Sequence, residues 1–461
     1  MHRRWPRPAA RPKPPRPSRP WPGTSSWACW RGCGRWRWRR RRADPATEAD
    51  PVPALALPAA TERDRERAAL IVIAAGVCAA LHVGKLPPAI PVLQSALGLT
   101  LVQAGFLLSL VQLAGMSVGV AFGVLADGLG LRRSLLLGLA VLALASAAGG
   151  TAVSAAQLMM LRAVEGFGFL LVVLPAPGLV RQLVPPQRLA RAMGLWGAYM
   201  PVGTASALLL GPLLIEWLGW RAWWWGLAAL SAAMVGVVLR TVPDRAAGPR
   251  PATLLPWSQR LRHTLAAPGP WLLALTFACY SGQWLAVVGF LPTVYRQAGV
   301  DPALTGVLTA LAAAANIVGN VGSGRLLHGG WAAPRLLAIG FATMALGSAL
   351  AFVDLGQPAA LRYGAVLVFS MVGGVIPGTL FALVVRAAPG EHTLSSTVGW
   401  MQQWSAFGQF AGPPAVAWLA SAMGGWQYTW AATGASALLG LWLVTRIARL
   451  LAARSAPTRP G

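Results

Sequence analysis

The run AVLALASAAGG, from Ala140 to Gly150, contains no charged side chain and does not alternate between apolar and polar residues. A strand of a membrane β-barrel would alternate with a period of two residues. A helix satisfies its own backbone hydrogen bonds, so an apolar run in lipid is expected to be helical. With its apolar neighbours the run covers 132–152, close to the roughly 20 residues that cross a bilayer. We therefore predict a transmembrane helix there.

Eleven further runs have the same character. Helices of soluble proteins average about 11 residues, so twelve such runs in series indicate membrane spans. Of all residues 56% are hydrophobic and 11% are charged, whereas soluble domains carry about 25% charged residues. These values exclude an ordinary soluble enzyme and predict an all-α integral membrane protein with twelve transmembrane helices. The predicted spans are 68–95, 101–126, 132–152, 156–180, 190–216, 220–242, 270–295, 303–326, 333–353, 361–385, 392–420 and 426–448.

The formal net charge of +26 is concentrated near the N-terminus. Residues 1–43 contain 14 Lys and Arg and no acidic residue. A basic segment attracts phosphates, but twelve spans far exceed what an anchor for a nucleic-acid-binding tail needs. We expect residues 1–66 to form a basic, disordered tail that can bind anionic lipid headgroups, and we expect no nucleic-acid partner.

An alternative interpretation is that part of this tail is an over-extended start. No Met occurs between Met1 and Met116, and a start at a non-Met codon, for example at Val52, would leave the membrane part intact. Residues 1–51 would then be absent from the mature protein. Mass spectrometry decides between the two interpretations, because peptides from residues 1–43 would contradict the shorter chain.

The distribution of arginines predicts the orientation of the spans. With the N-terminus inside, the cytoplasmic segments from Arg67 onward contain 18 Arg and the opposite loops contain three, which are Arg221, Arg296 and Arg362. Cytoplasmic loops of membrane proteins carry an excess of Lys and Arg. We therefore expect a multi-pass protein of the cell inner (plasma) membrane with both termini in the cytoplasm.

The two halves of the chain resemble each other at a spacing near 200 residues. Gly105 and Gly123 are eighteen residues apart, as are Gly306 and Gly324. Parallel repeats of this kind are a transporter architecture, with substrate held between the halves. We predict six-helix bundles over 67–242 and 270–450, a cytoplasmic loop over 243–269 and a C-terminal tail over 451–461. The other paired dipeptides are Pro177-Gly178 with Pro377-Gly378, Gly211-Pro212 with Gly412-Pro413, and Gly219-Trp220 with Gly425-Trp426.

Two segments carry a resemblance to a known family. The loop GVLADGLGLRR, Gly123 to Arg133, and the start of the fourth span, LRAVEGFGF, resemble motifs of the Major Facilitator Superfamily. Gly128 and Leu131 depart from the loop motif. Gly399, Gly408 and Gly412-Pro413 have the spacing of the family's antiporter motif, but in span eleven rather than five. The resemblance implies secondary transport, with spans one, four, seven and ten around a central cavity.

Ionisable residues inside a bilayer are costly and are candidates for function. Span one contains His82 and Lys85, and span four contains Arg162 and Glu165. Each pair has i,i+3 spacing and shares a helix face, and both pairs fall at similar depth, so we expect one cluster. Its single net positive charge favours an anionic or polarised solute. We interpret Glu165 as the proton site and Arg162 as its switching partner.

Each of these residues also has a structural interpretation. Lys85 lies near Pro87 and Pro88, and its ammonium can extend to the membrane interface. Arg162 and Glu165 can form a purely structural ion pair. His82 can be a hydrogen-bonded helix contact.

Neutral polar and aromatic residues form a second set of candidates, because amides and ring edges can orient a small solute. The alternative for each is hydrogen bonding or packing between helices. The predicted substrate contacts are Gln283, Trp284, Gln403, Trp196 and Tyr199.

The cytoplasmic loop after span two is a candidate gate. Asp127 is a carboxylate near a helix end that can pair with an arginine across the bundle interface, and breaking such pairs biases inward- and outward-open states. Arg132 and Arg133 follow it, and Gly123 and Gly130 flank it.

Enzyme motifs are missing from the sequence. It contains no P-loop, no HExxH and no G-x-S-x-G, and its five His are not at metal-site spacing. We expect no cofactor, no metal and no enzyme activity. The predicted function is secondary active transport of a small solute, an organic anion or polar metabolite, by alternating access with proton coupling, in a monomer. The alternatives are a drug or toxic-compound efflux antiporter of the same fold, and a membrane-embedded enzyme.

Overall fold

The computed structural model describes residues 62–117, 130–243 and 256–455, all of which lie in one compact unit, Ala60–Gly461. These residues form helices and short connections, and none of them lies in a strand. The predicted tail up to residue 61, with its alternative start, lies outside the described residues. So do Gly123 and Asp127 of the predicted gate, and 118–126 of the second predicted span.

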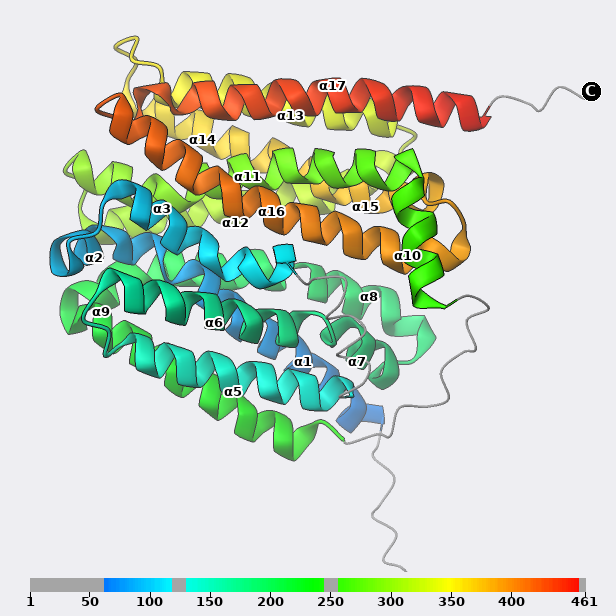
Figure 1. Cartoon of the computed structure of the whole chain (residues 1–461), viewed down its shortest axis with the longest axis horizontal. Helices are drawn as coiled ribbons and strands as arrows, with labels where there is room; N and C mark the ends of the chain where they lie inside the picture. Colours follow the sequence, from blue (N-terminus) through cyan, green and yellow to red (C-terminus); the bar gives the residue numbers. More distant parts are fainter. Residues whose placement is uncertain (1–61, 118–129, 244–255, 456–461) are drawn as a thin grey trace, which may run out of the picture. The chain divides into compact units, whose positions relative to one another are not determined.

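The N-terminal half is built from helices that follow the predicted spans (Figure 1). Its elements are α1 (Glu62–Gly84), η1 (Pro87–Ala89), α2 (Ile90–Leu97), α3 (Leu101–Ser109), η2 (Leu110–Gln112), α5 (Leu131–Gly149), α6 (Ala155–Val173), α7 (Ala176–Leu183), α8 (Pro186–Gly197) and α9 (Tyr199–Thr241).

The C-terminal half begins with a short helix inside the predicted loop. Its elements are α10 (Trp257–Ala266), α11 (Pro268–Gln297), α12 (Pro302–His328), α13 (Ala333–Phe352), α14 (Ala359–Gly373), α15 (Val375–Ala387), η3 (Glu391–Thr393), α16 (Leu394–Ala422), η4 (Trp426–Tyr428) and α17 (Thr429–Ser455).

Nine helical stretches of the described residues are long and apolar enough to cross a membrane. One of them, Leu195–Thr241, covers most of the fifth and sixth predicted spans, which Gly219 separates with a φ of 82° that favours glycine. The second predicted span follows the shorter apolar helix Leu101–Ser117. The eleventh follows α16, which is 29 residues long and rich in Gln and Ser. The twelve-helix fold is thus accounted for.

Some helix ends differ from the sequence-based boundaries. The first helix begins at Glu62 rather than at the predicted residue 68, and Glu62 and Asp64 in its first turn suit the positive end of a helix dipole. Ten residues of the predicted loop form α10, and α17 continues to Ser455. The terminal turns of these helices contain polar residues, so the apolar runs end before the helices do.

Each half buries its own apolar core. One cluster of buried side chains contains residues only from Ala68 to Val242, and another contains residues only from Leu273 to Leu451. In Figure 1, α1, α5 and α6 lie side by side in one half, and α13 lies beside α17 in the other.

The two halves meet along two helix–helix contacts, here called the seams. Each seam contains one of two glycines, Gly105 and Gly306, that are equivalent in the internal repeat. The pairs α3–α16 and α9–α12 make the main contacts between the halves. A Cβ atom on Gly105 would lie 2.9 Å from Cα of Pro414, and one on Gly306 would lie 2.9 Å from the carbonyl oxygen of Leu209. Equivalent glycines therefore allow close backbone approach at equivalent places in both halves.

The first span is interrupted after Lys85 because prolines follow. Pro87 and Pro88 have no backbone N–H, so they cannot continue the hydrogen bonding of α1 to the carbonyl oxygens four residues earlier. The carbonyl oxygens of Val83 and Gly84 are thus left without their usual helical donors. The break lies beside the charged residues of this span.

Candidate functional site

The four charged candidates of spans one and four form one buried cluster. One carboxylate oxygen of Glu165, Oε1, lies 2.5 Å from Nζ of Lys85, and the other, Oε2, lies 2.7 Å from Nη1 of Arg162. Nδ1 of His82 lies 3.9 Å from Oε1. The prediction that the two pairs come together is therefore matched by the geometry.

The broken end of α1 accepts hydrogen bonds from Arg162. Nη1 of Arg162 donates to the carbonyl oxygen of His82 at 2.5 Å, and Nη2 donates to that of Val83 at 3.4 Å. The Val83 carbonyl is one of those that Pro87 leaves without a helical donor. The guanidinium thus links α6 to α1 through backbone carbonyl oxygens of α1, while its side-chain acceptor Glu165 lies on α6 itself.

Two serines, which were not among the predicted site residues, complete the cluster. Nζ of Lys85 donates to Oγ of Ser146 at 2.9 Å, and Ser146 donates to the carbonyl oxygen of Trp224 at 2.9 Å. Nε2 of His82 lies 2.8 Å from Oγ of Ser231. A polar residue within an apolar run, as Ser146 is, was the available sequence signal.

Tryptophans close the other side of the cluster. Nζ of Lys85 lies 4.7 Å from the ring centroid of Trp224, which is a cation–π distance. Nε1 of Trp223 donates to the carbonyl oxygen of Lys85 at 3.1 Å. The side chains of His82 and Lys85 are 0% exposed, so the interpretation that Lys85 extends to the interface does not describe this structure.

The cluster lies apart from the larger cavities of the described residues. It carries two cations and one carboxylate, hence one net positive charge if His82 is neutral. Arg162 and Glu165 border only a small recess with Leu107, Leu158 and Trp224 among its walls. In this conformation the cluster forms a buried ion-pair network, and the recess beside it is too small for an organic solute.

A larger cavity of about 680 Å³, here called the central cavity, lies between the halves. Its walls come from η2, Gly115, the start of α5 and α6 to α9 on one side, and from α10 and α16 on the other. Its polar lining residues are Gln112, Tyr199, Arg260, Ser395, Ser396, Gln402, Gln403, Ser405 and Gln409. Nε2 of Gln112 donates to Oε1 of Gln409 across the halves at 3.0 Å.

The predicted neutral contacts divide between different places. Trp196, Tyr199 and Gln403 line the central cavity, where the first two rings stack with centroids 4.2 Å apart. Gln283 lines a different pocket, and Trp284 lines neither of these two. Nε1 of Trp284 instead donates to Oγ of Ser370 at 3.0 Å. The periodicity of a helix predicts on which side of the helix a residue lies. It does not predict which of two neighbouring cavities that side borders.

The described part of the predicted gate consists of Gly130, Arg132 and Arg133. Gly130 has a φ of 88°, which suits a glycine, and precedes α5. Nη2 of Arg132 donates to the carbonyl oxygen of Leu239, at the end of α9. This contact joins the start of the third span to the end of the sixth.

Two glycines of the antiporter-like spacing in α16, Gly408 and Gly412, have a packing role, whereas Gly399 lines the central cavity. A Cβ atom on Gly282 would lie 2.7 Å from the carbonyl oxygen of Gly408, and Gly412 faces the backbone of Gly282 in turn. These residues let α16 pack directly on α11. Within the described residues, no group of three His, Cys, Asp or Glu side chains could hold a metal ion.

The fold and the central cavity define the class, a helical membrane transporter built from two bundles. Residues 72–413 match the sequence model of the Major Facilitator Superfamily. The chain belongs to this family. It is 30% identical over 337 residues to a chloramphenicol resistance protein of Streptomyces lividans, which covers 71% of this chain and 83% of that protein.

Other relatives match over shorter segments. The tetracenomycin C resistance and export protein of Streptomyces glaucescens is 36% identical over 121 residues, 25% of this chain and 22% of that protein. An uncharacterised transporter of Mycobacterium tuberculosis is 33% identical over 164 residues, 36% of this chain and 24% of that protein. The chain thus spans about a quarter of the length of these two relatives.

Solved structures share the fold. A bacterial homologue of the human lysosomal transporter Spinster, inward-facing and occupied, has a TM-score of 0.72 and 16% identity, covering 86% of this chain and 100% of that one. A D-xylose–proton symporter has a TM-score of 0.64 and 16% identity, covering 82% and 96%.

Proposed function

We propose that this protein is a secondary active transporter that carries a small polar organic solute across the cytoplasmic membrane by alternating access, coupled to protons. The observation that carries the proposal is the central cavity, which lies between two similar halves and is bounded by both. Transporters with parallel repeats hold their substrate at this place. The protein acts as a monomer in the bilayer.

The side of the membrane to which the central cavity opens follows from its place along the helices. The cavity lies at one end of the interface between the halves, and the seams lie at the other. In α16 the cavity-lining residues run from Ser395 to Gln409, and the seam with α3 follows at Pro413 and Pro414. In α9 the cavity-lining Tyr199 likewise precedes the seam. The arginine distribution supports a cytoplasmic location for the cavity end, so we propose that this conformation is inward-open, with both termini in the cytoplasm.

The lining favours a neutral or anionic solute. The described wall of the cavity offers amides, hydroxyls, aromatic rings and the cation Arg260, but no Asp or Glu. Amides both donate and accept hydrogen bonds, and the rings of Trp196 and Tyr199 can pack against an apolar part of the solute. A cationic solute would find no carboxylate there.

A second candidate, efflux of drug-like compounds by antiport, is favoured by the relatives. Several are antibiotic resistance or export proteins. The two candidates differ in substrate and in the direction of coupled flux. A thermal-shift screen against small anions, neutral polar compounds, aromatic drugs and cations separates them, and stabilisation by cations alone would contradict the first.

Replacing Gln403 with Leu is expected to raise KM for the transported solute about tenfold, the loss of one hydrogen bond in a buried site. Nε2 of Gln403 also donates to the carbonyl oxygen of Met116 at 2.8 Å, so kcat for alternation is expected to change as well. The measurement is initial uptake into proteoliposomes over a range of solute concentrations. The exposed Gln427→Leu on the same half is the control, and an unchanged KM in Gln403→Leu would remove this residue from the site.

A further inference from the structure

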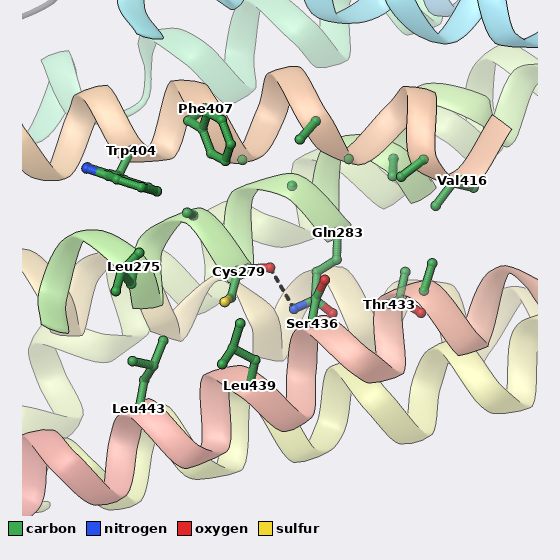
Figure 2. A pocket seen from close by; sticks show the side chains of 18 of the residues that line it. Leu275, Cys279, Gln283, Trp404, Phe407, Val416, Thr433, Ser436, Leu439 and Leu443 are labelled. Carbon is green, nitrogen blue, oxygen red and sulfur yellow. Dashed lines mark hydrogen bonds between the residues drawn. The ribbon is translucent and has the colours of Figure 1, made fainter. Parts of the chain in front are cut away.

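A second opening lies in the C-terminal half, where α11, α16 and α17 meet. It encloses about 390 Å³, within the range of pockets that hold small organic ligands. It shares no lining residue with the central cavity. We call it the lateral groove, and Figure 2 shows it with Gln283, Trp404 and Leu443 on its walls.

The walls of the lateral groove are apolar. Leu275 from α11, Leu439 and Leu443 from α17, Val416 from α16, and the rings of Trp404 and Phe407 line it together with alanines and glycines (Figure 2). The centroids of these two rings lie 5.2 Å apart. A flat aromatic compound therefore finds both aliphatic and aromatic partners here.

The groove opens between α16 and α17 toward the outside of the bundle. These two helices pack closely on α11 but contact each other little. Phe407, Leu439 and Trp442 border the opening with 43%, 50% and 53% of their side chains exposed. Exposed apolar side chains on a membrane span face hydrocarbon, so an occupant of the groove would come from the lipid phase.

One buried polar side-chain atom of the residues that line the groove lacks a hydrogen-bond partner. Gln283 is 3% exposed and reaches from α11 toward α17 (Figure 2). Its Nε2 donates to the carbonyl oxygen of Cys279 at 3.0 Å, which fixes the orientation of the amide. Its Oε1 is buried and has no partner among the described residues. Buried polar atoms of native proteins are nearly always hydrogen-bonded, so this oxygen points to a missing donor.

We propose that the lateral groove binds a small lipophilic compound with one hydroxyl or N–H group, and that Oε1 of Gln283 accepts its hydrogen bond. A lipid acyl chain would fill the groove but leave Oε1 without a donor. The hydroxyl of Thr433 is already used, because it lies 2.7 Å from Oγ of Ser348. The proposal concerns binding and does not depend on the transport function or on its substrate.

The test compares two probes with the same ring system. 1-Naphthol carries a donor, whereas 1-methoxynaphthalene does not. Binding is measured on the full chain in lipid nanodiscs, with empty nanodiscs subtracted. We expect the wild type to bind 1-naphthol about tenfold more tightly than the ether, the effect of one buried hydrogen bond. Gln283→Leu is expected to bind both probes equally, and retained ether binding shows that the variant is folded.

A second pair of variants locates the bound probe. Ala415→Trp places a large ring in the groove and is expected to lower the affinity for both probes at least tenfold. Ala435→Trp, on an exposed part of α17 outside the groove, is expected to leave binding unchanged. Equal wild-type affinities for the two probes, a preference that persists in Gln283→Leu, or unaffected binding in Ala415→Trp would each overturn the proposal.

Discussion

Replacing Glu165 with Gln is expected to abolish proton-coupled flux and to lower the free energy of unfolding by about 3–5 kcal/mol. The carboxylate is 2% exposed and is paired with both Lys85 and Arg162. Its neutralisation leaves two buried cations without a counter-charge, which is far more costly than loss of a surface pair. Chemical unfolding in detergent measures the stability, and substrate-driven acidification in proteoliposomes measures the flux.

The charges of the cluster also predict an order of effects. Lys85→Met leaves the neutral pair of Arg162 and Glu165 and is expected to destabilise less than Glu165→Gln. Glu216→Gln, an exposed carboxylate on α9, is the control and is expected to change neither property. Full coupled flux in Glu165→Gln would disprove the proposal that Glu165 is the proton site. A loss of flux that only follows the loss of folded protein would favour the structural ion pair.

Valine at either seam glycine is expected to remove at least nine-tenths of transport activity. At Gly306 the added side chain meets the carbonyl oxygens of Leu209 and Leu208 at 2.9 and 3.3 Å, and at Gly105 it meets the backbone of Pro414. A backbone atom cannot rotate away as a side chain does, so the seam has to separate. The conformation with both seams closed should therefore be lost.

Gly322→Val is the matched control, since it lies on the same helix α12 as Gly306 and would meet nothing within 4 Å. It is expected to keep near wild-type transport, because Val is no worse than Gly in a helix interior. Transport is compared after correction for the amount of folded protein in the membrane. Similar losses in Gly322→Val and Gly306→Val would show that helix substitution in general, and not the seam, causes the defect.

The fold was predictable because each long apolar run specifies a membrane helix by itself, and because the repeated glycine spacing reveals that the two halves are similar. The run from Ala140 to Gly150 predicted a membrane helix, and the matching spacing from Gly105 and from Gly306 indicated the repeat, but the role of these two glycines at the seams came from the structure. The helix ends at Glu62 and around α10 were missed, because charged and polar residues there look like loops.

The candidate site was predictable only in part. Charged residues in apolar spans stand out, and the similar depth of the two pairs predicted that Lys85 and Glu165 lie near one another, as they do. Ser146, which Lys85 contacts, lies inside the apolar run that predicted a helix. A single serine in such a run does not stand out as a site residue. The separation of Gln283 from Gln403 depends on how α11 and α16 cross, which no single-helix pattern contains.

The proline break of α1 has a mechanical consequence. The carbonyls near this break hold the guanidinium of α6, and the ring of Trp223 on α9 donates to the backbone of Lys85. These hydrogen bonds join α1, α6 and α9 at the same depth. Sliding one of these helices along the others would break several of the bonds at once. These bonds leave little room for the three helices to move relative to one another. We therefore expect the N-terminal half to rotate as a rigid body, with the glycine seams as its contact with the other half.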